Sequence, residues 1–115
     1  METKGPQTMN TPDDPSRAEV DAMAGPVLLE FGAAHCGHCR TAQPVIAGAL
    51  ASHPLVRHIK VEDGPGRPLG RSFRVKLWPT LVFLREGREV VRLVRPADPA
   101  AIEQALVQVG AVPLP

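Results

Sequence analysis

Residues 27–50 read VLLEFGAAHCGHCRTAQPVIAGAL, and they contain the strongest structural signals of the chain. It opens with an apolar run over residues 27–31, which is bounded by Gly25-Pro26 before it and Gly32 after it. A short apolar run between such breakers predicts a strand that is buried on both faces. Glu30 interrupts the run, and a carboxylate is unusual in the middle of a buried strand.

A helix is expected directly after this strand, from Cys36 to about Ser52. Its apolar residues recur at helical spacing, at Val45, Ile46, Ala49 and Leu50. Pro44 lies inside the pattern and should kink the helix. The sequence therefore predicts a buried strand, a short loop and a bent helix that begins at two cysteines.

The rest of the chain predicts three further helices and three further strands. Their expected ranges are Ser16–Met23 (helix, capped by Ser16 or Asp14), Leu55–Val61 (strand), Leu69–Arg74 (short helix), Thr80–Leu84 (strand), Glu89–Val94 (strand) and Pro99–Gly110 (helix, capped by Asp98). Gly87 lies at the tip of a tight turn over residues 85–88, so the last two strands are expected to be antiparallel neighbours. This alternation of helices and strands is typical of the α/β class.

Length and composition indicate one domain. The chain has 115 residues, of which 43% are hydrophobic and 22% charged, close to the averages of globular proteins. Its net charge of +1 argues against a nucleic-acid binder, and no apolar stretch is long enough for a membrane span. Residues 1–15 predict a flexible arm, which precedes a domain over residues 16–112. No secretory signal is evident, so we expect a cytoplasmic protein.

The two cysteines are the candidate reactive groups. Cys36 and Cys39 are two residues apart at the start of a helix, where unpaired backbone N–H groups stabilise a thiolate. Cys36, at the tip, is the expected attacking thiolate on a disulfide. Cys39 lies almost one turn inside and can resolve the mixed disulfide by attacking Cys36. Gly37 lets the turn between them close.

The ordered set of motifs resembles the thioredoxin family over roughly residues 16 to 110. The matching features are an acidic residue six before the first cysteine (Glu30), the C-x-x-C (Cys36 and Cys39), a helix-kinking proline (Pro44), a proline–threonine at the third strand (Pro79-Thr80) and a glycine-tipped hairpin (Gly87). The resemblance implies a thioredoxin fold, with a mixed sheet of four strands, or of five, flanked by helices on both faces. It also implies disulfide exchange with protein substrates by a monomer, without a bound cofactor other than the redox-active Cys36–Cys39 disulfide. The reductant would be another protein or a small thiol.

The resemblance also implies roles for the residues around the cysteines. A cis peptide is expected between Trp78 and Pro79, which with Gly37 and Thr80 would present the backbone to an extended substrate segment. Glu30 would be the proton acceptor for Cys39, with a pKa raised by burial. The register between the strand of Glu30 and the strand of His58 and Lys60 is not predicted, so no cation is assigned to Glu30.

Gly37-His38 between the cysteines resembles the centre of protein disulfide isomerases, and His38 is expected to stabilise the reduced form and to make the disulfide more oxidising. The family's glycine after the fourth strand is absent, with Arg95 or Pro96 near its place. Without this glycine, we do not expect a substrate backbone to approach the loop after the fourth strand closely.

Other interpretations of these residues stay open. Glu30 can be a carboxylate at a strand end turned to solvent, and His38 a solvated histidine that tunes nothing. The cysteines can be half of a zinc site, for which the histidines on offer are His35, His38, His53 and His58. The fold can also serve as a non-catalytic adaptor or chaperone that holds clients in a groove beside Trp78 and Pro79.

Overall fold

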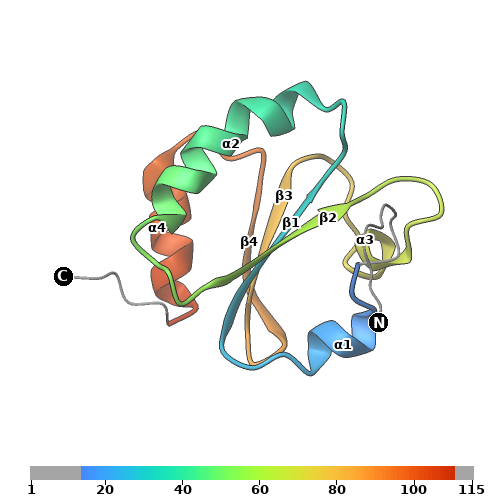
Figure 1. Cartoon of the computed structure of the whole chain (residues 1–115), viewed down its shortest axis with the longest axis horizontal. Coiled ribbons are helices and arrows are strands. Elements are labelled where there is room, and N and C mark those ends of the chain that lie inside the picture. Colours follow the sequence, from blue (N-terminus) through green and yellow to red (C-terminus); the bar gives the residue numbers. More distant parts are fainter. Residues whose placement is uncertain (1–13, 111–115) are drawn as a thin grey trace, which may run out of the picture.

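Eight elements follow one another along residues 14–110, the part of the chain that the computed structural model describes (Figure 1). They are α1 (Arg17–Asp21), β1 (Pro26–Gly32), α2 (Gly37–Leu50), β2 (Arg57–Glu62), α3 (Pro68–Ser72), β3 (Thr80–Arg85), β4 (Arg88–Val94) and α4 (Pro99–Gln108). Their order is the predicted one.

The strands form one mixed sheet in the order β2-β1-β3-β4. β1 runs parallel to β2 and antiparallel to β3, and β3 is antiparallel to β4. β1 is therefore central, and residues 27–31 are buried as their apolar run predicts. The described residues contain four strands, the first of the two numbers that the resemblance leaves open.

Helices cover both faces of this sheet. Side chains alternate between the two faces along each strand, so the buried strands present apolar side chains to both. On one face Leu28, Leu81 and Phe83 pack against residues of α2 and α4. On the other face Val27, Leu29 and Phe31 pack with Val20 of α1 and with Leu69 and Phe73 at α3. Glu30 has the parity of Leu28, so it faces α2 and α4. The predicted thioredoxin fold is confirmed.

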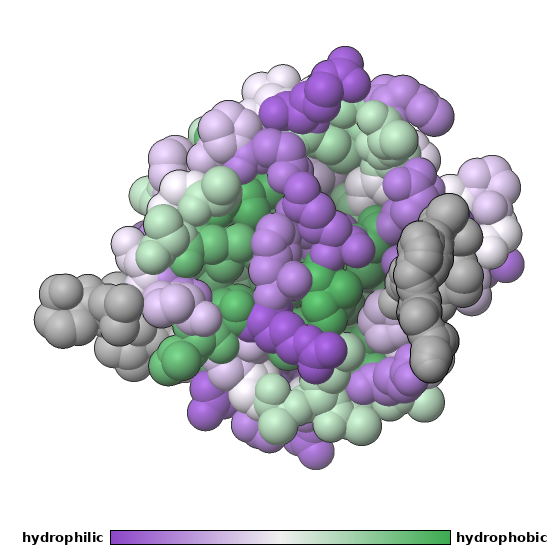
Figure 2. Space-filling view, in the orientation of Figure 1, coloured by the Kyte–Doolittle hydropathy of each residue, from purple (hydrophilic) through white to green (hydrophobic). Residues whose placement is uncertain are grey.

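The edge strand β2 differs most from its prediction. It spans Arg57–Glu62 and not Leu55–Val61, because the chain still turns at Val56, whose backbone N–H donates to the carbonyl of His53 at 3.1 Å. Leu55 is consequently 78% exposed, although an apolar residue in a half-buried strand was expected to be covered. Most of β2 is exposed. Figure 2 shows hydrophilic side chains across the middle of this face of the molecule, with apolar surface on both sides.

Helix ends also differ from the predictions, and α4 ends at Gln108, two residues before Gly110. α1 ends at Asp21 and not at Met23, and α2 ends at Leu50 and not near Ser52, since the chain continues there in turns whose N–H groups bond three residues back. α3 covers Pro68–Ser72 and not Leu69–Arg74, because Pro68 occupies its first turn and Arg74 adopts a left-handed backbone with φ of 58°. These are shifts of one or two residues at element ends.

The β3–β4 turn lies at the end of the sheet opposite to the start of α2 (Figure 1). Glu86 and Gly87 both have positive φ, of 52° and 78°, as in the tightest hairpin turns. A Cβ on Gly87 would lie 2.0 Å from the carbonyl oxygen of Asp21, so only glycine lets the hairpin approach α1 this closely.

The predicted arm over residues 1–15 and the last two residues of the predicted domain lie mostly outside the described residues, which exclude residues 1–13 and 111–115. Of the predicted arm, Asp14 and Pro15 are described, and the Asp14 carboxylate accepts a hydrogen bond from Arg67 at 3.2 Å. Within residues 14–110, no helix combines the length and the apolar character that crossing a membrane requires.

Candidate active site

Cys36 is the N-cap residue of α2 and ends the loop that follows β1. Its backbone is extended, with φ of −90° and ψ of 114°, and its Sγ accepts a hydrogen bond from the backbone N–H of Cys39 at 3.1 Å. Both cysteines are free thiols, and Cys36 is partly exposed. The sulfur of Cys36 thus takes the position in which a helix N-terminus stabilises a negative charge.

Cys39 lies one turn inside the helix and is buried, at 8% exposure. Burial, the contact with Cys36 and the charge of Glu30 raise the pKa of the Cys39 thiol to about 11. Gly32 makes room for this thiol, since a Cβ on that glycine would lie 2.9 Å from Cys39 Sγ. The structure therefore places an accessible sulfur beside one that is buried and protonated at neutral pH.

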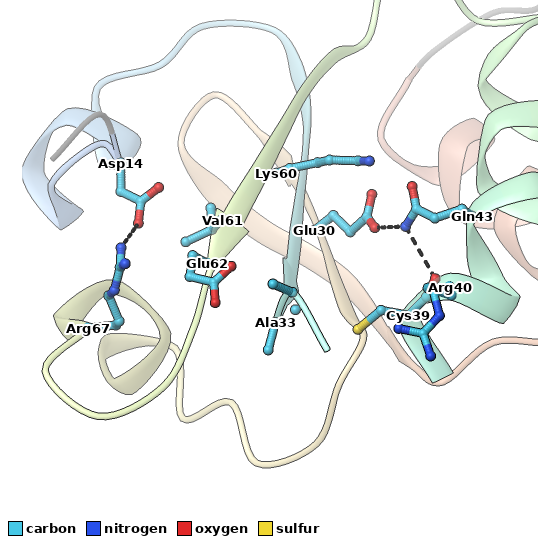
Figure 3. A pocket seen from close by; sticks show the side chains of 12 residues that line it. Asp14, Glu30, Ala33, Cys39, Arg40, Gln43, Lys60, Val61, Glu62 and Arg67 are labelled. Atoms are coloured by element: carbon cyan, nitrogen blue, oxygen red, sulfur yellow. Dashed lines mark hydrogen bonds and ion pairs between the residues drawn. The ribbon is translucent and has the colours of Figure 1, made fainter. Parts of the chain in front are cut away.

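Glu30 is buried, at 5% exposure, and holds two hydrogen bonds. Its Oε1 lies 2.7 Å from Nε2 of His58 on β2, and its Oε2 accepts a hydrogen bond from the side-chain amide of Gln43 on α2. The same Gln43 amide also donates to the carbonyl oxygen of Cys39 at 3.3 Å (Figure 3). Gln43 thereby connects the carboxylate to the backbone of the buried cysteine.

These partners reverse the expected effect on Glu30. Burial does raise its pKa, but hydrogen bonds from His58 and Gln43 and the positive charges of His58 and Lys60 outweigh burial, and the pKa lies below its ordinary value. The predicted raised pKa is therefore wrong, because the sequence did not show that β2 brings cations to this position. The alternative of a solvent-facing carboxylate is also wrong.

A pocket of about 580 Å³ adjoins both groups. Among its lining residues are Glu30, Cys39, Gln43, Lys60 and Arg40 (Figure 3). Figure 3 shows the Cys39 sulfur and the Glu30 carboxylate on the same side of α2, with Lys60 above the carboxylate. Water that enters the pocket can reach both side chains.

The segment before β3 forms hydrogen bonds with two residues, Asp63 and Arg95. The Trp78–Pro79 peptide is cis, as the resemblance implies. The Trp78 indole Nε1 donates a hydrogen bond to the Asp63 carboxylate at 2.8 Å. The backbone carbonyl oxygen of Trp78 accepts a hydrogen bond from Arg95 Nε, also at 2.8 Å. The backbone N–H of Arg95 donates to the Pro79 carbonyl at 2.9 Å. Arg95, with a left-handed φ of 51°, thus occupies backbone acceptors that were expected to face a substrate.

The remaining predicted site residues are placed as follows. Gly37 is exposed at the first position of α2, and nothing lies within 4 Å of where its Cβ would be. His38 is exposed and lines a small pocket of about 150 Å³ together with Arg95. Within the described part of the chain, no hydrogen bond joins His38 to Cys36. Thr80 is buried, and its hydroxyl donates to the Leu77 carbonyl at 2.6 Å, so this side chain points inward.

Sequence reasoning left several site residues without a role: His58, Gln43, Gly32, Asp63 and Arg95. Pairing of His58 with Leu28 and of Lys60 with Glu30 across the parallel strands decides which cations meet the carboxylate, and a sequence does not fix this register. His58 contacts Glu30, and His53 is buried against Glu103 at 2.8 Å, so both of these candidate zinc ligands have other partners. Over residues 14–110, no three acidic, histidine or cysteine side chains converge to hold a metal ion.

Comparisons with known proteins agree with this geometry. The family model described as Thioredoxin matches residues 8–108. A solved structure of thioredoxin 2 from Pseudomonas aeruginosa PAO1 in its reduced form is 55% identical, with a TM-score of 0.77 over 90% of this chain and 97% of that one. Thioredoxin from Mycolicibacterium smegmatis is 30% identical over 86% of this chain and 91% of its own length.

Thioredoxin H-type 1 from Nicotiana tabacum is 32% identical over 71% of this chain, and the match spans 64% of that relative. The chain thus covers less than two thirds of some curated relatives, and only 21% of a TPR repeat-containing thioredoxin from Arabidopsis thaliana. The family model nevertheless matches most of the chain, and the C-x-x-C pair lies at the start of a helix after the central strand. This chain therefore belongs to the thioredoxin family.

Proposed function

We propose that this chain exchanges a dithiol for a disulfide with protein substrates through Cys36 and Cys39. The observation that carries the proposal is the hydrogen bond from the Cys39 backbone N–H to Cys36 Sγ at the first turn of α2. This contact favours the thiolate at the more exposed of two neighbouring sulfurs, and only a thiolate attacks a disulfide. Thioredoxins act on protein disulfides, which supports protein clients for this chain as well.

The exchange proceeds in two balanced steps. The Cys36 thiolate attacks one sulfur of a client disulfide, so that a Cys36–client bond forms, the client disulfide breaks, and the released client thiolate takes up a proton. Cys39 then loses its proton and attacks Cys36 Sγ, which forms the Cys36–Cys39 disulfide and releases the second client thiolate. The client gains two electrons and the protein loses two. Both electrons come from the cysteines, so we propose that no bound cofactor takes part.

The second step requires a proton to leave a thiol that binds it tightly. With a pKa of about 11, roughly one Cys39 in ten thousand is a thiolate at pH 7. Formation of the mixed disulfide removes the negative charge of Cys36, which is one cause of the raised pKa. The first step therefore prepares the second by making Cys39 easier to deprotonate.

Glu30 is a weak base for this task by itself, because its pKa is below the ordinary value. Effective general bases have a pKa near the working pH. We propose that Glu30 and His58 act as a pair, in which Glu30 receives the proton through water in the adjoining pocket and His58, partly exposed, exchanges it with solvent. His38 keeps its proposed role of stabilising the reduced form.

The remaining proposals concern partners and location. We propose that a protein or a small thiol reduces the Cys36–Cys39 disulfide and that the chain works as a monomer. We also propose a cytoplasmic location, since the chain has two cysteines, both in the C-x-x-C pair, and none left for a structural disulfide. The Trp78–Pro79 segment would contact the client beside the thiols.

Reduction of insulin by the purified chain, with dithiothreitol as the electron source, tests the proposal. The full chain should accelerate precipitation of insulin chains, and Cys36→Ser should abolish the acceleration. When Cys39→Ser is reduced, freed of dithiothreitol and mixed with insulin, it should accumulate a mixed disulfide that added dithiothreitol releases. Acceleration by the full chain that survives Cys36→Ser contradicts the assignment. Insulin binding without reduction would instead indicate the non-catalytic adaptor.

A further inference from the structure

We propose that the active-site end carries a basic rim that selects clients with acidic residues beside the reactive disulfide. The rim consists of Arg71, Arg74, Lys76 and Arg95. The inference rests on the proposed function, because it concerns which protein disulfides the Cys36–Cys39 site accepts.

One side of the rim follows α3. Arg71, Arg74 and Lys76 are exposed and line a pocket of about 420 Å³ together with Asp63. None of the three cations has a hydrogen bond or an ion pair with another residue's carboxylate in the described chain. The left-handed backbone at Arg74 turns the chain after α3 and leads it through Lys76 to Trp78. These charges therefore precede the cis-proline segment directly.

Arg95 lies on the other side of the same segment. Its Nε is bonded to the Trp78 carbonyl, while its two Nη groups have no partner among residues 14–110. It also shares a small pocket with His38 in the first turn of α2. Cations thus flank the Trp78–Pro79 segment from α3 and from the loop after β4, and one of them adjoins the helix turn that bears the cysteines.

Asp63 is the carboxylate that lines the same pocket as Arg71, Arg74 and Lys76, so it offsets part of the rim and positive charge stays in excess there. Asp63 accepts the hydrogen bond from the Trp78 indole, and Asp98 caps α4 by accepting from the backbone N–H of Ala100 at 2.9 Å. Glu62 is exposed at the end of β2 and lines the pocket that contains Arg40 and Arg67. An acidic segment of a client would therefore meet an excess of positive charge beside the Trp78–Pro79 segment.

The chemistry at this position favours a peptide segment over other anions. The chain as a whole carries only one net positive charge, so the rim is a local feature and not part of a basic surface suited to a long polyanion. Arg95 of the rim shares a pocket with His38, which lies between the two cysteines, so a ligand of the rim is held close to a reacting disulfide. Exposed ion pairs are weak one by one, and the rim should act mainly on the rate at which acidic clients associate.

The test uses two short synthetic peptides, each with one internal disulfide, that differ only in having Glu or Gln on both sides of the cysteines. The full chain is reduced, freed of reductant and mixed with each peptide. Acid-quenched samples are alkylated, and mass spectrometry follows the loss of the Cys36 and Cys39 thiols. This gives a second-order rate constant without any other protein.

At low ionic strength we expect the Glu peptide to react roughly three- to tenfold faster than the Gln peptide, the effect of two or three exposed ion pairs. The ratio should fall toward one in about 0.5 M salt, where such charges are screened. In the double variant Arg74→Glu/Lys76→Glu, the ratio should fall to one or below. In the control Arg57→Glu/Arg88→Glu, which makes the same kind of charge reversal at the far end of the sheet, the ratio should stay high.

The outcomes separate the two proposals. Equal rates for the two peptides with the unmodified chain, or an equal loss of preference in both double variants, overturns the basic rim and leaves the proposed function standing. Failure of both peptides to oxidise the chain contradicts the proposed function itself. The Gln peptide serves as the internal reference for a variant that folds poorly, since misfolding slows both reactions alike.

Discussion

Replacing His58 by leucine should reverse the direction in which the pKa of Glu30 is shifted. In the native chain His58 Nε2 lies 2.7 Å from the carboxylate, and His58 and Gln43 together outweigh the effect of burial. Without His58 the carboxylate keeps its burial at 5% exposure and loses its nearest cation. An opposite charge at such a distance lowers a carboxyl pKa, so its removal should raise the pKa of Glu30.

This change has a calculable effect on stability. Leaving a buried polar group without its partner costs about 1 to 3 kcal/mol, so the substitution should lower the free energy of unfolding at pH 7 by that amount. The partial exposure of His58 favours the lower end of this range. The measurement is the free energy of unfolding in urea between pH 3.5 and pH 7.5.

The pH dependence separates this effect from a loss of packing. A carboxyl whose pKa is lower in the folded state contributes stability above its unfolded pKa of about 4.5, and that stability is lost as the pH falls through the folded value. With the folded pKa raised in the variant, stability should instead decrease as the pH rises above about 4.5. The difference between the native chain and His58→Leu should therefore grow from pH 3.5 to pH 7.

Two control variants and one refuting result test this account of the Glu30 pKa. His58→Gln retains a hydrogen-bond donor without the charge and should lose part of the effect, while His35→Leu changes an exposed histidine and should show no such pH dependence. A difference between the native chain and His58→Leu that is constant from pH 3.5 to pH 7 would refute the reasoning.

Three further predictions concern the thiols and the helix. At pH 8 iodoacetamide should alkylate Cys36 well before Cys39, whose pKa is about 11; equal rates by peptide mass mapping would contradict the assignment of the attacking sulfur. Gly32→Ala should lower the melting temperature and slow insulin reduction, since its Cβ would lie 2.9 Å from Cys39 Sγ, whereas Gly48→Ala in α2, with nothing within 4 Å, should stabilise the chain by about 0.5 to 1 kcal/mol. Equilibration with glutathione buffers should give a reduction potential of about −190 to −240 mV that shifts downward in His38→Pro, and an unchanged potential would remove His38 from this role.

The sequence predicts the parts of the fold whose patterns are strong by themselves. β1 is an uninterrupted apolar run apart from Glu30, and α4 has a proline in its first turn and an aspartate cap, so both were located closely. β2 is an edge strand with few buried side chains, and its alternation therefore did not fix its ends. For this reason Leu55 was predicted to lie in the strand, whereas β2 begins two residues after it.

The environment of Glu30 could not be predicted for a different reason. Its pKa depends on His58 from β2 and Gln43 from α2, and these residues reach it only once the register of two parallel strands and the rotation of a helix are set. Thr80 shows the same limit, because its motif does not reveal that the hydroxyl turns inward to the Leu77 carbonyl. Motifs located the thiols, while tertiary contacts determine how the surrounding groups titrate.

The indole of Trp78, held by Asp63 at the cis-proline segment, also gives the protein an optical property. The chain contains one tryptophan and no tyrosine, so its near-ultraviolet emission arises almost entirely from this one side chain. A fluorescence-monitored unfolding curve would therefore follow the surroundings of Trp78 and not the whole sheet. Agreement between that curve and far-ultraviolet circular dichroism is needed before a single unfolding free energy is assigned to the chain.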